Sequence, residues 1–475
     1  MAHVLDADYS TRWLLPPSLE DLVPANHPAR FIREFVDALD LPHLGLVDSA
    51  CLDGRPPYAK SLLLKVWLYG YFHGIRSTRK LERACREHLS LLWLTGMNQP
   101  DHNSLWRFWS AHKQQVREVY RQSVSVALKA DLVSLALLAV DGTKIEAVSS
   151  GRSGWSKEYM EKVLKQLDSV LAEREAAIEH NEQAEQGEYR LPESLSERQA
   201  LKAAVQKGLA ELQESSRAHY HPVEPEAHRM KCNGINRFAF NAQAVADEKQ
   251  GIIVACDVTD HEHDVGQLTL MLGQARDLVR EVGSTQPEGV AIKAVADTGY
   301  GSGADIAQAK AAGFDVIAPV PEGKPKKDNA YHASAFTYDR QRNVCICPEG
   351  KELTLQGSKD RRGTRVNIYR CRCKDCAVRT RCTKDRKGRT IEIAGHHEEV
   401  VAMRAKLATA EGQDRYAQRA RIIEPRFAQV KSTQGFRRWT VRGLQKVKAQ
   451  WAWICTTANL HILFRSWAAG TLRFN

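Results

Sequence analysis

The sequence predicts an α/β protein with a mixed sheet, an all-α N-terminal region and two insertions. Three observations support this fold class. Apolar side chains recur at helical spacing over residues 1–130. Between residues 131 and 320, short apolar runs first follow one another and then alternate with helical patterns. Six of the eleven cysteines fall between residues 345 and 382, which favours a metal site over disulfides.

Length and composition narrow the class of protein. A chain of 475 residues is long enough for two to four domains of about 100–200 residues. The hydrophobic share of 43% and the charged share of 26% exclude wholesale disorder. No apolar run approaches the ~18–20 residues that span a bilayer. The first residues also lack the basic and apolar regions of a secretory signal. We therefore expect a cytoplasmic protein with no membrane partner.

The net charge of +11 is unevenly distributed. Residues 321–475 carry 33 Lys and Arg against 14 Asp and Glu, a net charge of +19, whereas residues 131–320 carry a net −11. Such a basic region attracts polyanions, and nucleic acid is the commonest of these. The alternative is a solvated basic surface that only aids solubility.

The first region is expected to be helical throughout. Helices are predicted over residues 59–72, over residues 79–88, and from near Asn103 towards Ala130. Ser77 or Thr78 can cap the second of them. Short helices joined by Gly- and Ser-containing turns are typical of a helix-turn-helix DNA-binding domain. A helical bundle without that role fits the pattern equally well.

The sheet region is expected to present two carboxylates at strand ends. Strands are predicted at residues 134–146, 237–247, 251–260, 291–300 and 314–320, and helices at residues 265–282 and 303–313. Asp141 and Asp297 stand at the ends of two of these strands, and Gly142 and Gly299 leave room for a bulky ligand. Two such carboxylates can hold divalent cations for phosphate chemistry, although Asp-Gly by itself usually marks a turn.

Two insertions complete the organisation. A charged antiparallel helical hairpin is predicted over residues 155–213, because Pro192 interrupts the pattern and Ser194–Glu197 forms a capping box. The predicted domains are a helical DNA-binding domain at 1–130, a catalytic domain at 131–321 and 396–475 that contains the hairpin, and a basic cysteine-rich insert at 322–395.

Several ordered motifs carry a resemblance to a known family. They are DGTKIEA (141–147), EPEAHRMK (224–231), FNAQAVAD (240–247), VADTGYGSG (295–303) and YAQRARIIEPRFAQVK (416–431). Together they resemble the transposase of a bacterial insertion sequence, of the DDE class, with a ribonuclease H-like catalytic domain. The motifs GRPPY (54–58) and YGYFHGIRSTRKLE (69–82) are similar to the helical N-terminal domain of that group. The resemblance therefore covers essentially the whole chain.

The resemblance implies a triad of acidic residues that bind Mg²⁺ or Mn²⁺. Asp141 and Asp297 match its first two members. The third belongs to a C-terminal signature, which matches Tyr416, Arg419, Glu424 and Lys431 here. The spacing from Arg419 to Glu424 is one residue longer than in the commonest form of the signature, and Arg421 is the alternative to Arg419. Other candidates for the third acid are Glu146 and the positions of Gln445 and Gln450, where relatives often carry Glu.

Pro425 raises a local conflict, because a residue before proline is disfavoured in a helix. Either Glu424 is an N-cap with Pro425 at the first helical position, or the helix kinks there.

The implied reaction is Mg²⁺-dependent cleavage and strand transfer at the ends of the element's own DNA. Two ions about 3.5–4 Å apart would activate the attacking oxygen and stabilise the leaving one. The expected DNA contacts are Tyr416, Arg419, Arg421, Lys431, Arg437, Arg438 and Trp439. Trp439 either stacks on an unpaired base or is a core residue.

The implied partners are double-stranded DNA, at the element ends and the target, and a second copy of the chain. No small-molecule substrate is expected, and the implied location is the bacterial cytoplasm near the nucleoid. The alternatives are a relative that binds DNA without catalysis, and a structure-selective nuclease of the same fold.

The cysteine-rich insert is expected to bind structural Zn²⁺. Four of its six cysteines must be chosen, and we favour Cys347, Cys373, Cys376 and Cys382, because CPEG and CKDC are typical of knuckle turns and relatives carry a comparable set. The alternative is a group of reduced thiols without metal. Lys and Arg are concentrated around these cysteines, so the insert is expected to contact DNA phosphates.

A further cluster, His261-Glu262-His263-Asp264, resembles a ligand set but lacks a third distant ligand. We interpret it as structural, near the floor of the active site.

Overall fold

The computed structural model describes residues 18–48, 56–149, 154–182, 193–215, 217–232, 234–282, 291–320, 330–361, 364–371, 373 and 375–474. Its helices are α1 (Leu19–Leu22), α2 (Pro28–Asp37), α3 (Lys60–Phe72), α4 (Thr78–Glu87), α5 (Leu89–Leu94), α6 (His102–Ala111), α7 (Lys113–Lys129), α8 (Lys157–Glu182), α9 (Glu193–Glu214), α10 (Leu268–Glu281), α11 (Gly303–Ala311), α12 (Arg379–Cys382), α13 (His397–Ala408), α14 (Ala410–Ala428) and α15 (Leu444–Ala468). Its strands are β1 (Leu138–Glu146), β2 (Trp155–Ser156), β3 (His219–Tyr220), β4 (His228–Cys232), β5 (Ile235–Asp247), β6 (Ile253–Thr259), β7 (Ile292–Ala296), β8 (Phe314–Ile317), β9 (Thr337–Asp339), β10 (Val344–Ile346), β11 (Glu352–Arg361), β12 (Thr364–Arg370) and β13 (Thr390–Ala394). The predicted α/β class with a mixed sheet and a helical N-terminal region is confirmed.

The central sheet has the strand order β4-β5-β1-β7-β8, and β6 also pairs with β5. The long strand β5 pairs with β4 over its first residues and with β6 over its later ones. β1 runs antiparallel to β5 and parallel to β7. All five strands predicted for this region are present, and β4 is an edge strand that the pattern did not predict.

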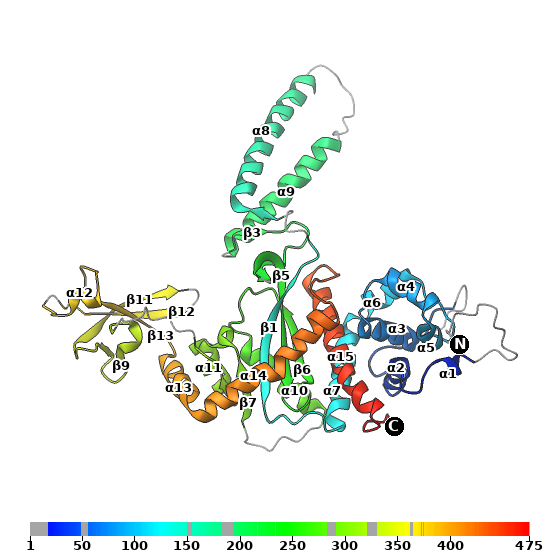
Figure 1. The fold of residues 1–475 in the computed structure, drawn as a ribbon. Helices are drawn as coiled ribbons and strands as arrows, with labels where there is room; N and C mark the ends of the chain where they lie inside the picture. The colour runs from blue at the N-terminus through cyan, green and yellow to red at the C-terminus, as the bar shows by residue number, and fades with distance from the viewer. Residues whose placement is uncertain are drawn as a thin grey trace, which may run out of the picture.

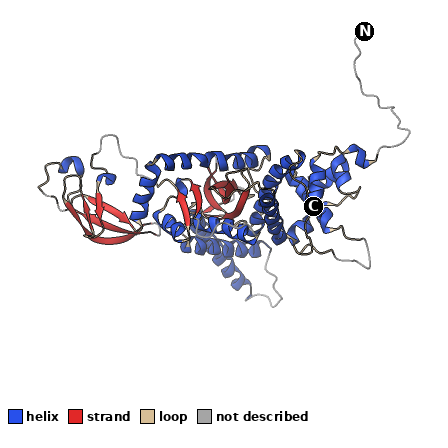
Figure 2. Ribbon diagram, turned by 90° about the horizontal axis from the view of Figure 1, so that it is seen from below, coloured by secondary structure: helices blue, strands red, loops and turns tan. Residues whose placement is uncertain are grey.

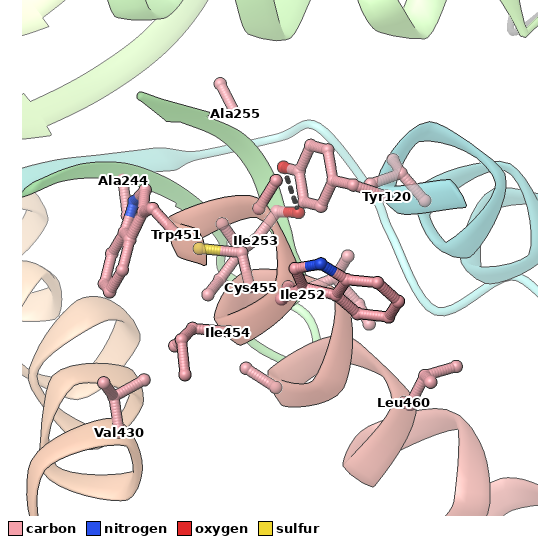
Figure 3. Close-up of a cluster of buried hydrophobic side chains, with 14 of the residues drawn as sticks. Tyr120, Ala244, Ile252, Ile253, Ala255, Val430, Trp451, Ile454, Cys455 and Leu460 are labelled. Carbon is pink, nitrogen blue, oxygen red and sulfur yellow. Dashed lines mark hydrogen bonds between the residues drawn. The ribbon is translucent and has the colours of Figure 1, made fainter. Parts of the chain in front are cut away.

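The C-terminal helix α15 joins the sheet to the helical domain. It contacts α7 and α3 on one side and β6 on another (Figure 1). Its side chains are buried on nearly every face. A helix that is apolar all round belongs in a core. Figure 3 shows Trp451, Ile454, Cys455 and Leu460 of α15 among residues of the sheet.

Polar groups fix α15 against strand β6. The Asn459 side chain accepts a hydrogen bond from the Ile253 N–H at 2.8 Å and donates one to the Ile253 carbonyl at 3.0 Å. The Tyr120 hydroxyl, from α7, donates to the same carbonyl at 2.8 Å (Figure 3). Helical domain, strand and C-terminal helix therefore meet at one buried backbone position.

The helical domain differs from its prediction in one respect. The helix expected from Asn103 towards Ala130 is divided into α6 and α7, because His112 has a non-helical backbone. Asp101 caps α6 by accepting a hydrogen bond from the Ser104 N–H at 2.6 Å. A predicted cap, Ser77, precedes α4 but makes no side-chain capping bond.

Both insertions form separate units. Helices α8 and α9 are the predicted hairpin, which projects from the sheet end in Figure 1. The cysteine-rich insert contains an antiparallel sheet, with order β13-β12-β11-β10-β9, that the sequence pattern did not predict. In Figures 1 and 2 this small sheet lies at the opposite end of the molecule from the helical domain, with the central sheet between them.

Candidate active site

Strand pairing brings Asp141 and Asp297 together. Val140 of β1 is the parallel partner of Ala296 of β7, so the next residue along the chain from each is one of the two aspartates. Asp297 follows the end of β7 and caps a short 3₁₀ turn, Thr298–Tyr300, by accepting a hydrogen bond from the Gly299 N–H at 2.8 Å. The sequence placed Asp141 at a strand end, but β1 continues past it to Glu146, because residues 142–146 keep pairing with β5. The two aspartates lie side by side because each directly follows one of the paired residues Val140 and Ala296.

The closeness of the two carboxyl groups affects the pKa of Asp141. Burial and the nearby Asp297 raise the pKa of Asp141 to about 6, against the opposing effects of Arg419 and the Gly142 N–H. Two like charges in a poorly solvated place disfavour full ionisation. A cation placed here would relieve that repulsion, which is a property expected of a metal-binding pair.

Helix α14 places Arg419 and Glu424 over this edge. Arg415, one turn before Arg419, is buried and donates to Asp315 of β8 at 2.6 Å, which anchors the helix to the sheet. Arg419 Nη1 lies 3.0 Å from Asp141 Oδ2, and Arg419 Nη2 lies 3.2 Å from Glu424 Oε1. The Glu424 side chain remains 58% exposed. One guanidinium group thus connects the first and third predicted acids.

The charge on Arg419 is strongly favoured. Burial alone would lower its pKa, but Asp141, Tyr416, Asp297 and Glu424 together raise the pKa above its usual value. The guanidinium therefore acts as a fixed cation between carboxylates.

Pro425 lies inside α14, so the N-cap alternative for Glu424 is wrong. The helix continues to Ala428 and passes into a π-helical segment, Gln429–Thr433. Proline has no N–H to donate to the carbonyl of Arg421, which is one turn earlier. The helical register is thus perturbed where the signature runs from Glu424 to Lys431, and π segments frequently occur at functional sites.

The other predicted DNA contacts lie in different surroundings. Burial lowers the pKa of Lys431, while Cys232 and Asp141 act to raise it, so its ammonium group lies within the field of the site. Arg437 Nε donates to the Lys431 carbonyl at 3.2 Å, and Arg438 Nε donates to the Ala147 carbonyl at 3.1 Å. Tyr416 is half-buried against the core, and Arg421 is exposed.

The structure places Trp439 in the core. Its side chain is 2% exposed, and its indole N–H donates to the Ile145 carbonyl at 3.1 Å. The ring packs edge to face against Phe240, Phe436 and Trp451. Of the two interpretations that the sequence left open, this burial fits the core residue, since no face of the indole is free for a base.

The other candidate positions for the third acid make different contacts. Glu146 forms an ion pair with Arg237 at 3.0 Å. Gln450 is buried and accepts a hydrogen bond from the Thr440 N–H at 3.0 Å, while Gln445 is exposed. Gln450 is thus part of the packing between α15 and the preceding loop.

Asp264 is a residue of the site whose role the sequence did not predict. It follows two exposed histidines, His261 and His263, in the loop after β6. Its carboxylate binds Lys144 Nζ at 2.9 Å and lies among polar side chains of the central sheet. The sequence offered one indication of this role, because the cluster that contains Asp264 and the two histidines was expected to lie near the floor of the active site.

The cysteines of the insert converge on one small cavity. Cys347, Cys371, Cys373, Cys376 and Cys382 all line it. Burial and the neighbouring thiols raise the pKa of Cys382, against the effect of Arg389. Cys345 is fully buried in the small sheet instead.

Over the described ranges, no three or more His, Cys, Asp or Glu side chains form a group that could hold a metal ion. At the carboxylates, Arg419 stands between Asp141 and Glu424 in place of such a group. The donor types nevertheless fit the expected ions, since carboxylate oxygens suit Mg²⁺ and thiolates suit Zn²⁺.

Two family models match the chain. The model described as a transposase DDE domain matches residues 346–464, and the one described as a transposase domain (DUF772) matches residues 17–111. The resemblance to a DDE transposase of an insertion sequence is confirmed. These families indicate an enzymatic role in DNA transposition. The first match includes Arg419 and Glu424, whereas Asp141 and Asp297 precede its first residue.

The other comparisons add no relative. No curated protein and no solved structure matches the chain significantly. In the part of the chain that the structure describes, we find no helix with the length and apolar character needed to cross a membrane.

Proposed function

We propose that the chain cleaves and joins DNA at the ends of its own insertion sequence in a reaction that depends on Mg²⁺ or Mn²⁺. The observation that carries this proposal is the adjacency of Asp141 and Asp297, with Arg419 between Asp141 and Glu424. The mixed sheet that presents these acids supports a ribonuclease H-like core.

Asp141, Asp297 and Glu424 would together hold the cation. When bound, the metal activates an attacking oxygen and stabilises the leaving oxygen. Arg419 and Lys431 are then placed to contact the phosphates beside the scissile bond, because both lie within the field of Asp141. The attacking oxygen belongs to water for cleavage and to the freed 3′-hydroxyl for strand transfer.

The basic insert would hold DNA through its phosphates. Arg379, Arg386 and Lys387 line one open cavity with Cys373, next to the thiol cavity. Zn²⁺ bound by Cys347, Cys373, Cys376 and Cys382 would stabilise this unit, since the thiols already face a common space. We propose that two copies of the chain assemble on two DNA ends in the bacterial cytoplasm.

Cleavage and joining of the flanking DNA ends in Mg²⁺ test this function. The parent protein should cleave and join, and Asp141→Ala, Asp297→Ala and Glu424→Ala should each do neither while still binding the DNA ends. A parent protein that binds but does not cleave would indicate an inactive relative. Cleavage without joining would indicate a nuclease. Full activity of Glu424→Ala alone would move the third ligand elsewhere.

A further inference from the structure

The Asp264 carboxylate is held by strand β1, which carries Asp141, and by its antiparallel neighbour β5. Its side chain is 14% exposed. Oδ1 accepts hydrogen bonds from Lys144 Nζ at 2.9 Å, Asn241 Nδ2 at 2.7 Å and Gln243 Nε2 at 2.8 Å. Lys144 lies on β1, and Asn241 is its cross-strand partner on β5. A loop residue is therefore fixed over the pair of strands that carries Asp141.

Two glycines make room for this carboxylate. A Cβ atom at Gly142 would lie 2.7 Å from Asp264 Oδ1. A Cβ atom at Gly299 would lie 2.9 Å from Asp264 Oδ2 and 2.9 Å from Asp297 Oδ1. All three separations are shorter than a side-chain carbon tolerates, so the glycines allow Asp264 to approach the backbone next to Asp141 and next to Asp297.

A buried hydroxyl continues the contact to Asp297. Gln243, which binds Asp264 through Nε2, accepts a hydrogen bond at Oε1 from the Tyr300 hydroxyl. Tyr300 is fully buried and ends the 3₁₀ turn that Asp297 caps. Burial and the carboxylates of Asp264, Asp141 and Asp297 raise the pKa of Tyr300 well above 10, so the hydroxyl remains a donor.

We propose that Asp264 is a positioning residue that holds the Asp297 turn at a fixed distance from Asp141, through Gln243 and Tyr300. The proposal rests on the function above, in which Asp141 and Asp297 bind the metal. Asp264 does not act as a ligand itself, because its Oδ1 atom already accepts three hydrogen bonds and Lys144 offsets its charge. Partners that orient metal ligands commonly change metal affinity or activity by about 10–100-fold when removed.

The test compares Asp264→Asn and Tyr300→Phe with the parent full-length protein. Mn²⁺ binding without DNA is measured by calorimetry, and cleavage of the DNA ends is measured across a Mn²⁺ titration. Both variants should weaken Mn²⁺ binding and raise the Mn²⁺ requirement by about tenfold or more. Their affinity for the DNA ends should stay at the parent value, so the loss appears in kcat and not in KM.

Asp247→Asn is the matched control. Asp247 is a buried aspartate at the far end of β5 that accepts hydrogen bonds from the Leu135 and Lys249 N–H groups. This variant should lower the melting temperature and keep the parent Mn²⁺ requirement. A shift in Asp247→Asn equal to that in Asp264→Asn would reduce the role of Asp264 to general stability and overturn the proposal.

Parent-like Mn²⁺ binding by Asp264→Asn would also overturn it. Should that variant fail to fold, Tyr300→Phe decides by the same criterion. Asp297→Ala separates the two proposals. If Asp297→Ala loses Mn²⁺ binding while Asp264→Asn keeps it, only the positioning role fails. If Asp297→Ala binds Mn²⁺ like the parent, the proposed function itself fails.

Discussion

The guanidinium of Arg419 lies 3.0 Å from the carboxylate of Asp141, although 278 residues separate them in the chain. The same guanidinium reaches Glu424 at 3.2 Å. It thereby supplies positive charge between two acids that the proposed function assigns to a divalent cation.

Substitution of Arg419 should separate its shape from its charge. Lys carries the charge but cannot contact both carboxylates through a planar fork. We expect Arg419→Lys and Arg419→Ala both to slow DNA cleavage by about a hundredfold or more, because the planar guanidinium that contacts both carboxylates and is preorganised beside the reacting phosphate is lost. Single-turnover cleavage rates measure this. Near-parent rates in Arg419→Lys would show that only charge is needed.

Asp141→Asn should stabilise the metal-free protein at high pH. Since the pKa of Asp141 is raised to about 6, the folded state binds this proton more tightly than the unfolded chain does. Its ionisation therefore costs stability as the pH rises from about 4 to about 6. Removing the charge should raise the free energy of unfolding by up to about 3 kcal/mol at pH 8, and by little at pH 4. Urea unfolding in EDTA measures both values.

Asp315→Asn is the control of opposite sign. The Arg415 and Lys406 side chains lower the pKa of Asp315 despite its burial, so its ionised form stabilises the fold above the ordinary carboxyl pKa. This variant should be less stable than the parent at pH 8. A loss of stability in Asp141→Asn as well would contradict the repulsion that we infer at the site.

The five predicted strands of the central sheet are present, because local patterns of apolar residues determine strands. Apolar runs followed by an acid singled out both Asp141 and Asp297, but only Asp297 follows the end of its strand, since β1 continues from Asp141 to Glu146. Their adjacency, in contrast, depends on the parallel pairing of β1 with β7, which spans more than 150 residues of sequence. Only the family resemblance supplied that relation.

Residues whose role depends on tertiary contacts were harder to predict. Asp264 stands in an irregular loop, and its partners on β1 and β5 are distant in sequence. Trp439 follows two arginines and precedes a polar loop, so the local pattern could not reveal that its ring packs between β5 and α15. The small sheet of the insert was missed because its strands are mostly polar and charged.

Trp439→Ala should lower the stability of the protein more than its affinity for DNA. Removing a buried indole that also donates a hydrogen bond should cost about 3–5 kcal/mol of unfolding free energy. Chemical denaturation measures the cost, and a filter-binding assay at low temperature measures DNA affinity. Weakened DNA binding with unchanged stability would restore the base-stacking interpretation.

The purified protein should contain about one Zn²⁺ per chain if the thiol cavity is a structural site. Cys376→Ser and Cys382→Ser should lose the metal, because three remaining thiolates and a hydroxyl bind Zn²⁺ weakly. Elemental analysis after dialysis measures the content. Cys345→Ala changes a buried thiol of the insert's small sheet that lies outside the cavity, so this variant should retain the metal. Zinc-free parent protein would identify the cysteines as reduced thiols.

Asn459→Ala should weaken the junction between the helical domain and the central sheet. The substitution removes both hydrogen bonds to the Ile253 backbone and leaves a buried N–H unsatisfied, at a cost of about 2–4 kcal/mol. Gln445→Ala changes an exposed residue of the same helix and should alter stability by less than about 0.5 kcal/mol. Thermal unfolding of both variants makes the comparison. Equal stability of the two would contradict the proposed role of Asn459.

The position of α15 in the chain has a consequence for biosynthesis. The helix packs against both the helical domain and strand β6, yet the ribosome makes it after every other described element. The apolar surfaces of α3, α7 and β6 therefore remain uncovered by α15 until most of the chain has emerged from the ribosome. A polypeptide interrupted before α15 would lack the helix that packs against both the helical domain and the central sheet.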